Sequence, residues 1–81
     1  MDVNVRLFAA PREAVGTNEL TVTLPDGATV AELIQQLTEA HPVLKAYVRF
    51  LSVAVNRAYV GQQTELHDGD EVALLPPVGG G

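Results

Sequence analysis

The chain has 81 residues, 47% of them hydrophobic and 19% charged, which is the size and composition of one small globular domain. Ten acidic residues against five basic ones give a formal charge of −5, which disfavours nucleic acids and anionic membrane surfaces as partners and favours a basic protein. The chain contains no cysteine, which excludes disulfide bonds, thiolate nucleophiles and cysteine-based metal sites. The N-terminal residues do not form a signal-peptide pattern, and no apolar run approaches the roughly 18 residues of a membrane helix, so we expect a cytoplasmic protein.

The first 27 residues predict two strands separated by a short helical segment. Residues 2–9 alternate between apolar and other side chains, which predicts a half-buried strand. Residues 10–16 are expected to form one helical turn ended by Gly16, and residues 19–24 alternate again before a turn at residues 25–27. In the first strand, one face is expected to carry Val3, Val5, Leu7 and Ala9, and the other Asn4, Arg6 and Phe8.

Residues 29–40 have the clearest helical pattern in the chain. Thr29 and Glu32 have the spacing of a capping box at the start of a helix. Pro42 is expected to end this helix, and residues 43–50 are interpreted as a short second helix. Apolar residues at helical spacing form a single stripe, made of Val30, Leu33, Ile34 and Leu37.

The remaining residues predict strands joined by turns. Residues 51–56 and 71–75 are expected to be strands, with a shorter strand near residue 59 and a turn at residues 67–70. A hairpin, one long helix with a single apolar stripe and returning strands together predict an α+β fold of the β-grasp (ubiquitin-like) type, with a mixed sheet covered on one face by the helix. We expect a domain over residues 1–75 and an extended tail over residues 76–81.

The domain offers few groups for catalysis. His41 lies at the predicted end of the long helix, where an imidazole favours the helix dipole, so we interpret it as a capping residue. His67 lies in the acidic stretch 65–71, which we interpret as a solvated turn that could dock basic side chains, and we expect no metal site. The sequence contains no nucleophile elbow, phosphate-binding loop or dinucleotide fingerprint.

The tail has the composition of a narrow probe. Pro76 and Pro77 favour an extended, stiff stem. The three final glycines carry no Cβ and can enter a passage too narrow for other residues. The α-carboxylate of Gly81 is ionised at neutral pH and is a poor acyl donor, so a partner would have to activate it, for example by adenylation.

Three segments resemble one known family: residues 5–17 (VRLFAAPREAVGT), residues 53–56 (VAVN) and residues 68–81 (DGDEVALLPPVGGG). Together they resemble the MoaD/ThiS family of ubiquitin-like sulfur carriers, and within it the small subunits of molybdopterin synthase. The resemblance implies that an activating enzyme, using ATP and Mg, adenylates Gly81, and that a sulfurtransferase system supplies the sulfur of a C-terminal thiocarboxylate.

The resemblance also implies partners and a client. The tail (Pro76, Pro77, Val78, Gly79 and Gly80) would insert into the large subunit of molybdopterin synthase, which would carry the catalytic residues. Sulfur would pass to a cyclic pterin precursor to form the molybdopterin dithiolene, within a heterotetramer of two small and two large subunits. The chain itself would bind no cofactor.

Phe8, Tyr59 and Leu75 align with the apolar positions that this family uses to dock its partners. They could instead close a thin core, but large apolar groups on an uncovered sheet face favour a binding site. One position departs from the family pattern, because Gly79 stands where serine, threonine or alanine is common.

Alternative functions remain open at this point. The carrier could serve thiazole synthesis for thiamin, cysteine synthesis or tRNA thiolation. The chain could also be a ubiquitin-like modifier joined to lysines through Gly81, or a binding module whose tail has no role.

Overall fold

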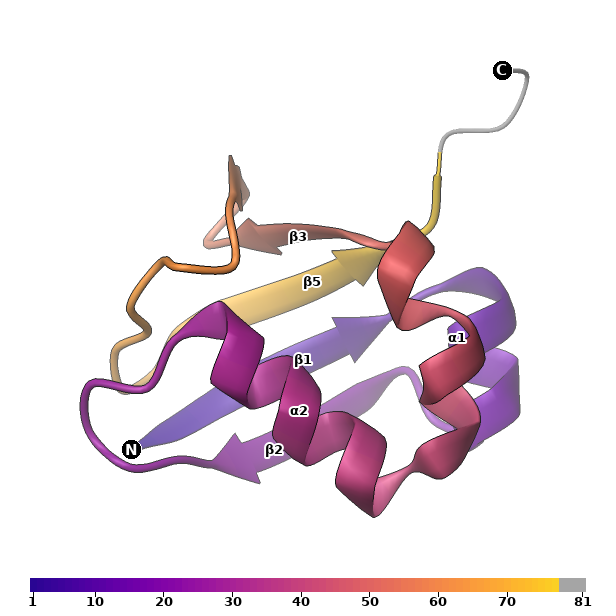
Figure 1. Ribbon diagram of the computed structural model, residues 1–81, viewed down its shortest axis with the longest axis horizontal. Coiled ribbons are helices and arrows are strands. Elements are labelled where there is room, and N and C mark those ends of the chain that lie inside the picture. The colour runs from indigo at the N-terminus through magenta and orange to yellow at the C-terminus, as the bar shows by residue number, and fades with distance from the viewer. Residues whose placement is uncertain (78–81) are drawn as a thin grey trace.

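The computed structural model describes residues 1–77 and contains a five-stranded sheet with helices packed against it (Figure 1). Its elements are, in chain order, β1 (Asp2–Leu7), α1 (Ala9–Val15), β2 (Glu19–Thr23), α2 (Val30–Ala40), the 3-10 helices η1 (Pro42–Ala46) and η2 (Val48–Phe50), β3 (Ser52–Val55), β4 (Ala58–Val60) and β5 (Glu71–Leu75). The predicted α+β arrangement is therefore confirmed. Within residues 1–77, no helix is long and apolar enough to cross a membrane.

The last strand lies in the middle of the sheet. The strand order is β2-β1-β5-β3-β4, and β5 runs parallel to β1 and antiparallel to β3. The register places Leu74 beside both Leu7 and Val53, and these three side chains are buried. Strands that are adjacent in the sheet but distant in sequence are therefore held together by the same apolar core.

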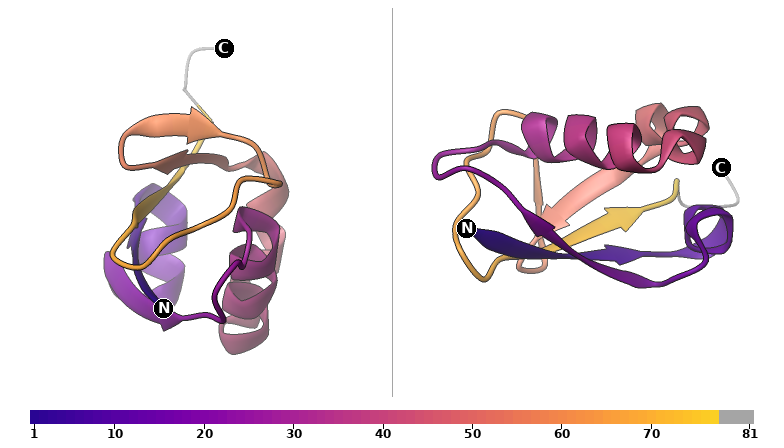
Figure 2. Two further views of the ribbon diagram at one scale, coloured as in Figure 1. Left: turned by 90° about the vertical axis from the view of Figure 1, so that its left-hand side faces the viewer. Right: turned by 90° about the horizontal axis from the view of Figure 1, so that it is seen from below.

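Helix α2 covers one face of the sheet (Figure 2). Its N-cap is Thr29, whose hydroxyl accepts the backbone N–H of Glu32 at 3.4 Å, as the capping pattern predicts. Three residues of the predicted stripe are buried, and they join a core to which every strand except β4 contributes. Its buried residues are Val3, Val5, Leu7, Val22, Leu24, Ala28, Val30, Leu33, Leu37, Leu44, Val53, Val55, Leu66, Val72 and Leu74.

Two local expectations are wrong. Ala9 does not continue the face of Leu7 but begins α1, with a φ of 54° and an exposed side chain, because the chain must leave the sheet to form the helix that contains the buried Pro11. Residues 43–50 do not form one helix but contribute to two 3-10 helices, η1 and η2. A 3-10 helix rarely exceeds one turn, so the segment can bend around the end of the sheet.

Candidate functional site: an apolar sheet face and the tail stem

The sheet face opposite α2, which we call the outer face, carries a row of side chains across four strands. Arg6 pairs with Ala73, Ala73 with Ala54, and Ala54 with Tyr59. The short side chains of the two alanines project little from the middle of this row, whereas the Tyr59 side chain at its edge is 71% exposed. An aromatic ring that projects beside a low strip of sheet can fit into a partner's pocket.

Phe8 and Leu75 lie next to this row, at neighbouring strand ends. Leu7 pairs with Leu74, and Phe8 and Leu75 are the next residues on those two parallel strands. The backbone of Phe8 stays extended (φ −135°, ψ 154°), so its side chain continues the alternation of β1 onto the outer face. Both side chains are half-buried. The structure therefore places Phe8, Leu75 and Tyr59 on one face; their role in docking stays a prediction.

The tail starts at the same end of the sheet. β5 ends at Leu75, Pro76 is half-buried and Pro77 is exposed (Figure 1). The other predicted tail residues, Val78, Gly79, Gly80 and Gly81, lie outside the described residues. A protein that covers the outer face at Phe8 and Leu75 would also meet the stem of the tail.

Phe50 is an exposed aromatic residue that the sequence pattern did not single out. Its side chain is 59% exposed, and it ends η2 two residues before Ser52, which pairs with Leu75. The guanidinium carbon of Arg49 lies 5.7 Å from the centre of its ring. The available signal was the scarcity of aromatic residues, because the chain has only two phenylalanines and two tyrosines.

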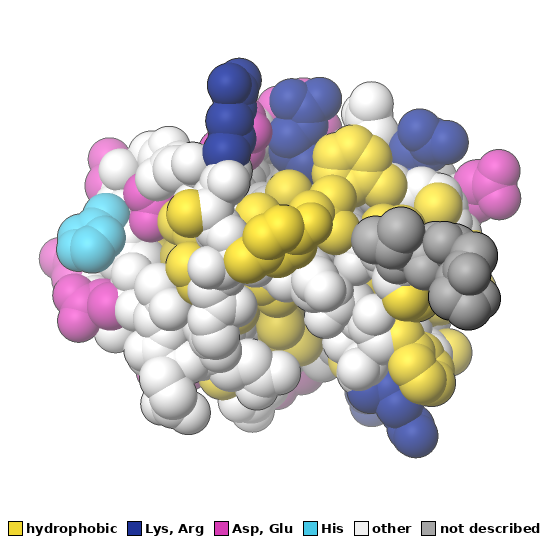
Figure 3. Space-filling view, turned by 90° about the horizontal axis from the view of Figure 1, so that it is seen from above, with side chains coloured by type: hydrophobic (Ala, Val, Ile, Leu, Met, Phe, Trp, Pro, Cys, Tyr) yellow, Lys and Arg dark blue, Asp and Glu magenta, His cyan; other side chains and the backbone are white. Residues whose placement is uncertain are grey.

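The outer face carries charges of both signs, because the register places Glu19 beside Arg6 and Glu71 beside Asn4 on that face. Figure 3, a view onto the top of the molecule as drawn in Figure 1, shows a band of hydrophobic side chains with Lys and Arg side chains on two sides of it and Asp and Glu side chains next to several of them. Among the Lys and Arg side chains of residues 1–77, only Arg6 forms an ion pair with a carboxylate, that of Glu71 at 3.9 Å. The acidic turn at residues 67–70 lies before β5, at the opposite end of that strand from the tail. If the acidic turn docks basic side chains, it does so away from the end of the sheet that carries Phe8, Leu75 and the tail.

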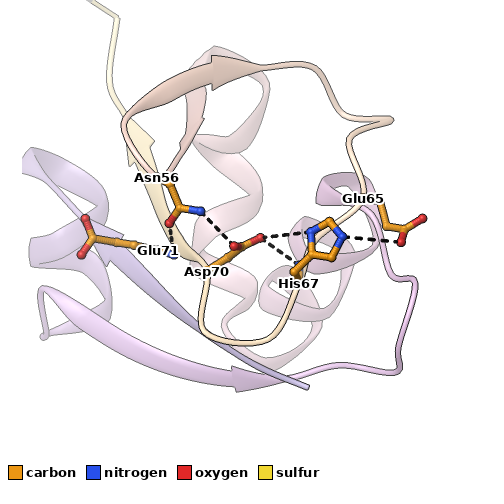
Figure 4. Close-up of polar contacts among 5 residues, drawn as sticks. All are labelled: Asn56, Glu65, His67, Asp70 and Glu71. Carbon is orange, nitrogen blue, oxygen red and sulfur yellow. Dashed lines mark hydrogen bonds and ion pairs between the residues drawn. The ribbon is translucent and has the colours of Figure 1, made fainter.

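The acidic turn is organised by the carboxylate of Asp70 (Figure 4). The backbone N–H of His67 donates to Asp70 Oδ2 at 2.8 Å, and Asn56 Nδ2 donates to Asp70 Oδ1 at 2.9 Å. Asn56 Oδ1 in turn accepts the backbone N–H of Glu71 at 3.0 Å. The network ties the β3–β4 turn to the start of β5, which indicates a structural role.

The imidazole of His67 contributes little to this network. It is 74% exposed and lies 3.9 Å from Glu65 and 4.0 Å from Asp70. Residues 1–77 contain no group of three or more histidine, cysteine, aspartate or glutamate side chains that could hold a metal ion. His41 lies at the predicted end of α2 as its C-cap residue, and its backbone N–H donates to the carbonyl of Leu37 at 2.8 Å; the interaction of its imidazole with the helix dipole stays a prediction.

Replacing Asp70 with alanine is expected to lower the free energy of unfolding by about 1–3 kcal/mol, because two donors lose a charged acceptor. The side chain of Asp70 is only 12% exposed, so water can replace the lost acceptor only in part. Glu65→Ala removes the same charge from an exposed position and is expected to change stability by less than about 0.5 kcal/mol. Denaturant titration of both variants measures the difference, and equal losses would contradict the structural role of Asp70.

Comparison with known proteins identifies the family. Residues 5–81 match the model of the ThiS family. The chain belongs to this family. It is 43% identical to a protein of Chlamydomonas reinhardtii named "Molybdopterin synthase sulfur carrier subunit", and the match covers 100% of both chains. The resemblance to ubiquitin-like sulfur carriers is thus confirmed, and a sulfur-carrier role is supported for the whole chain.

Solved structures confirm the β-grasp fold of this ThiS-family chain. It superposes on SAMP1, a small archaeal modifier protein from Haloferax volcanii, with a TM-score of 0.91 at 30% identity and coverage of 100% of both chains. It also matches a structure described as a protein–protein complex of subunits 1 and 2 of the molybdopterin-converting factor from Helicobacter pylori. That match has a TM-score of 0.73 at 27% identity and covers 100% of both chains.

Proposed function

We propose that this ThiS-family chain is the sulfur-carrier small subunit of a molybdopterin synthase. The observation that carries the proposal is the 43% identity, over the full length of both chains, to a protein with that name. The structure supports it through what residues 1–77 provide: an apolar face, Phe8, Leu75 and Tyr59 on it, and a tail stem beside them. A carrier needs these features more than it needs catalytic groups of its own.

The carrier chemistry begins at the terminal carboxylate of Gly81. An activating enzyme, with ATP and Mg, would join this carboxylate to AMP and release pyrophosphate. A sulfide-level sulfur from a sulfurtransferase system would then displace AMP and leave a thiocarboxylate. Activation is needed because a carboxylate is ionised at neutral pH and resists attack by a nucleophile.

Sulfur donation would take place in the large subunit. Pro76, Pro77, Val78, Gly79 and Gly80 would pass into its active site. The sulfur of the thiocarboxylate would form a bond to a carbon of the cyclic pterin precursor, and the bond from that carbon to an oxygen substituent would break as the oxygen leaves. Water would then cleave the bond between the sulfur and the carbonyl carbon of Gly81, which restores the carboxylate. Two such transfers supply the two sulfurs of the dithiolene.

Docking on the large subunit is assigned to Phe8, Tyr59 and Leu75. The half-buried positions of Phe8 and Leu75 and the exposed ring of Tyr59 support this assignment. The Helicobacter pylori complex of subunits 1 and 2 supports assembly with a second kind of subunit, and we propose a heterotetramer with two copies of each. Location in the cytoplasm stays a prediction.

Reconstitution with mass spectrometry tests the proposed function. The chain is incubated with the activating enzyme, ATP, Mg and the sulfurtransferase system, and its intact mass is measured. We expect a mass increase equal to one sulfur minus one oxygen, followed by molybdopterin formation when the large subunit and the pterin precursor are added. A thiocarboxylate that forms but does not lead to molybdopterin would indicate another client, such as thiazole, cysteine or thiolated tRNA.

A second candidate function is a ubiquitin-like protein modifier. The TM-score of 0.91 to SAMP1 favours it, because that protein is a modifier with the same fold. Under this function, Gly81 would form an amide with lysine side chains of other proteins. Covalent adducts in cells, detected by an affinity tag at the N-terminus, would distinguish the modifier from a carrier that accumulates only as the free thiocarboxylate.

A further inference from the structure

The hairpin that carries Tyr59 contains a residue in an unfavourable backbone conformation. Val55 pairs with Ala58, so Asn56 and Arg57 form a two-residue turn, and both have positive φ, at 49° and 73°. Such turns strongly prefer asparagine followed by glycine, because most side chains are strained in the left-handed region. Asn56 fits the preference, but Arg57 occupies the position that favours glycine.

The strain at Asn56 has a structural reason, whereas the arginine at 57 has none within the described domain. The amide of Asn56 bonds to both Asp70 and the backbone of Glu71. The exposed side chain of Arg57 forms no hydrogen bond or ion pair with any of residues 1–77. A strained position that keeps a charged residue without an internal partner favours a functional explanation.

The position of Arg57 indicates which part of a partner protein its side chain would contact. It precedes the exposed ring of Tyr59 by two residues, and Arg6 lies in the same cross-strand row as that ring. Arg6 forms an ion pair with Glu71 and lies beside Glu19, whereas Arg57 is a cation near this ring with no carboxylate partner within residues 1–77. A cation beside an apolar patch complements a carboxylate beside the partner's patch and speeds the encounter.

We propose that Arg57 pairs with an acidic group of the partner protein that covers Tyr59, so that the partner's surface is apolar where it meets this ring and acidic beside it. The proposal rests on the proposed function, since it takes the large subunit as that partner. It differs from the expectation from net charge, which favoured a basic partner. The β3–β4 turn would then keep an unfavourable backbone conformation at Arg57 because the charge of this residue selects the correct partner.

Three variants separate charge from backbone strain. Arg57→Gly removes the charge and relieves the strain, and Arg57→Glu reverses the charge. Lys45→Glu is the matched control, because Lys45 is an exposed cation in η1, on the α2 side of the sheet (Figure 2). Each variant is titrated into the purified large subunit at about 0.05 M and about 1 M salt, where the Debye length falls to about 3 Å.

We expect Arg57→Gly to melt at a higher temperature than the wild type and yet to bind about threefold more weakly at low salt. Arg57→Glu is expected to bind at least about tenfold more weakly at low salt, with most of the loss disappearing at high salt, while Lys45→Glu binds like the wild type. If the wild type binds the large subunit and both Arg57 variants bind with the same affinity, the inference is overturned and the proposed function stays intact. If the wild type does not bind the large subunit, both the inference and the proposed function are overturned. If the wild type associates with itself and Arg57→Glu does not, the partner of Arg57 is a second copy of the chain and the inference is overturned.

Discussion

A chain that lacks Gly81 is expected to fold, to bind the large subunit and to transfer no sulfur. The deletion moves the terminal carboxylate back by one residue, about 3.3–3.6 Å along an extended chain. A misplacement of about 1 Å at a reacting group can already lower a rate by about a hundredfold. We therefore expect at least a hundredfold loss of thiocarboxylate formation and of molybdopterin synthesis. The domain of residues 1–77 should be unaffected, because its core is complete at Leu74.

Two further tail variants make this test specific. Adding one alanine after Gly81 keeps every native residue but moves the carboxylate forward, and it should abolish transfer as completely as the deletion. Gly79→Ala keeps the length and places a family-typical residue before the final two glycines, so it should remain active. Intact mass, a melting curve and a binding titration are measured on all three. Molybdopterin formed by the extended chain would contradict the role of the terminal carboxylate.

Leu74→Ala and Leu75→Ala are expected to fail in different ways, although the residues are neighbours. Leu74 is fully buried against Leu7 and Val53, so its truncation should lower the free energy of unfolding by about 2–5 kcal/mol. Leu75 is half-buried on the outer face, so its truncation should cost the fold much less. Its truncation is expected to weaken binding to the large subunit by about 1.4 kcal/mol or more, which is about tenfold or greater.

Melting curves and titrations with the large subunit on the same samples decide this comparison. Phe8→Ala is expected to behave like Leu75→Ala, because the two side chains lie at adjacent strand ends. Tyr59→Ala is the sharpest variant, since the 71% exposed ring contributes little to the core. A fall in melting temperature with unchanged affinity in these outer-face variants would show that they only close the core.

The fold was predictable from local patterns because each element buries one face. Alternation in β1 places the side chains of Val5 and Arg6 on opposite faces of the sheet. The apolar stripe predicted for α2 includes its buried residues Leu33 and Leu37. The position of β5 between β1 and β3 was not predictable in this way, since strand order depends on contacts distant in sequence. The left-handed conformation of Ala9 was missed for a related reason, because it follows from where the chain must leave the sheet.

The candidate site was only partly predictable. Alternation placed Phe8 and Leu75 on the outer face, but whether they serve a partner is a property of that partner. Phe50 and Arg57 were not predicted because neither belongs to a periodic pattern. Only the folded structure shows that Phe50 is exposed near Ser52 and that the backbone of Arg57 is strained. The sign of the charge at the docking face could not be predicted from composition, since a total charge of −5 does not say where the charges lie.

The central place of β5 affects how the domain responds to mechanical force. The tail follows directly from this strand, which is hydrogen-bonded to β1 on one side and to β3 on the other. A pull on the tail along the strand direction therefore loads both ladders in shear, and many hydrogen bonds must yield together instead of one after another. Under the proposed function, in which partners bind and release the tail, we therefore expect the tail to be withdrawn from a partner without unfolding of the domain.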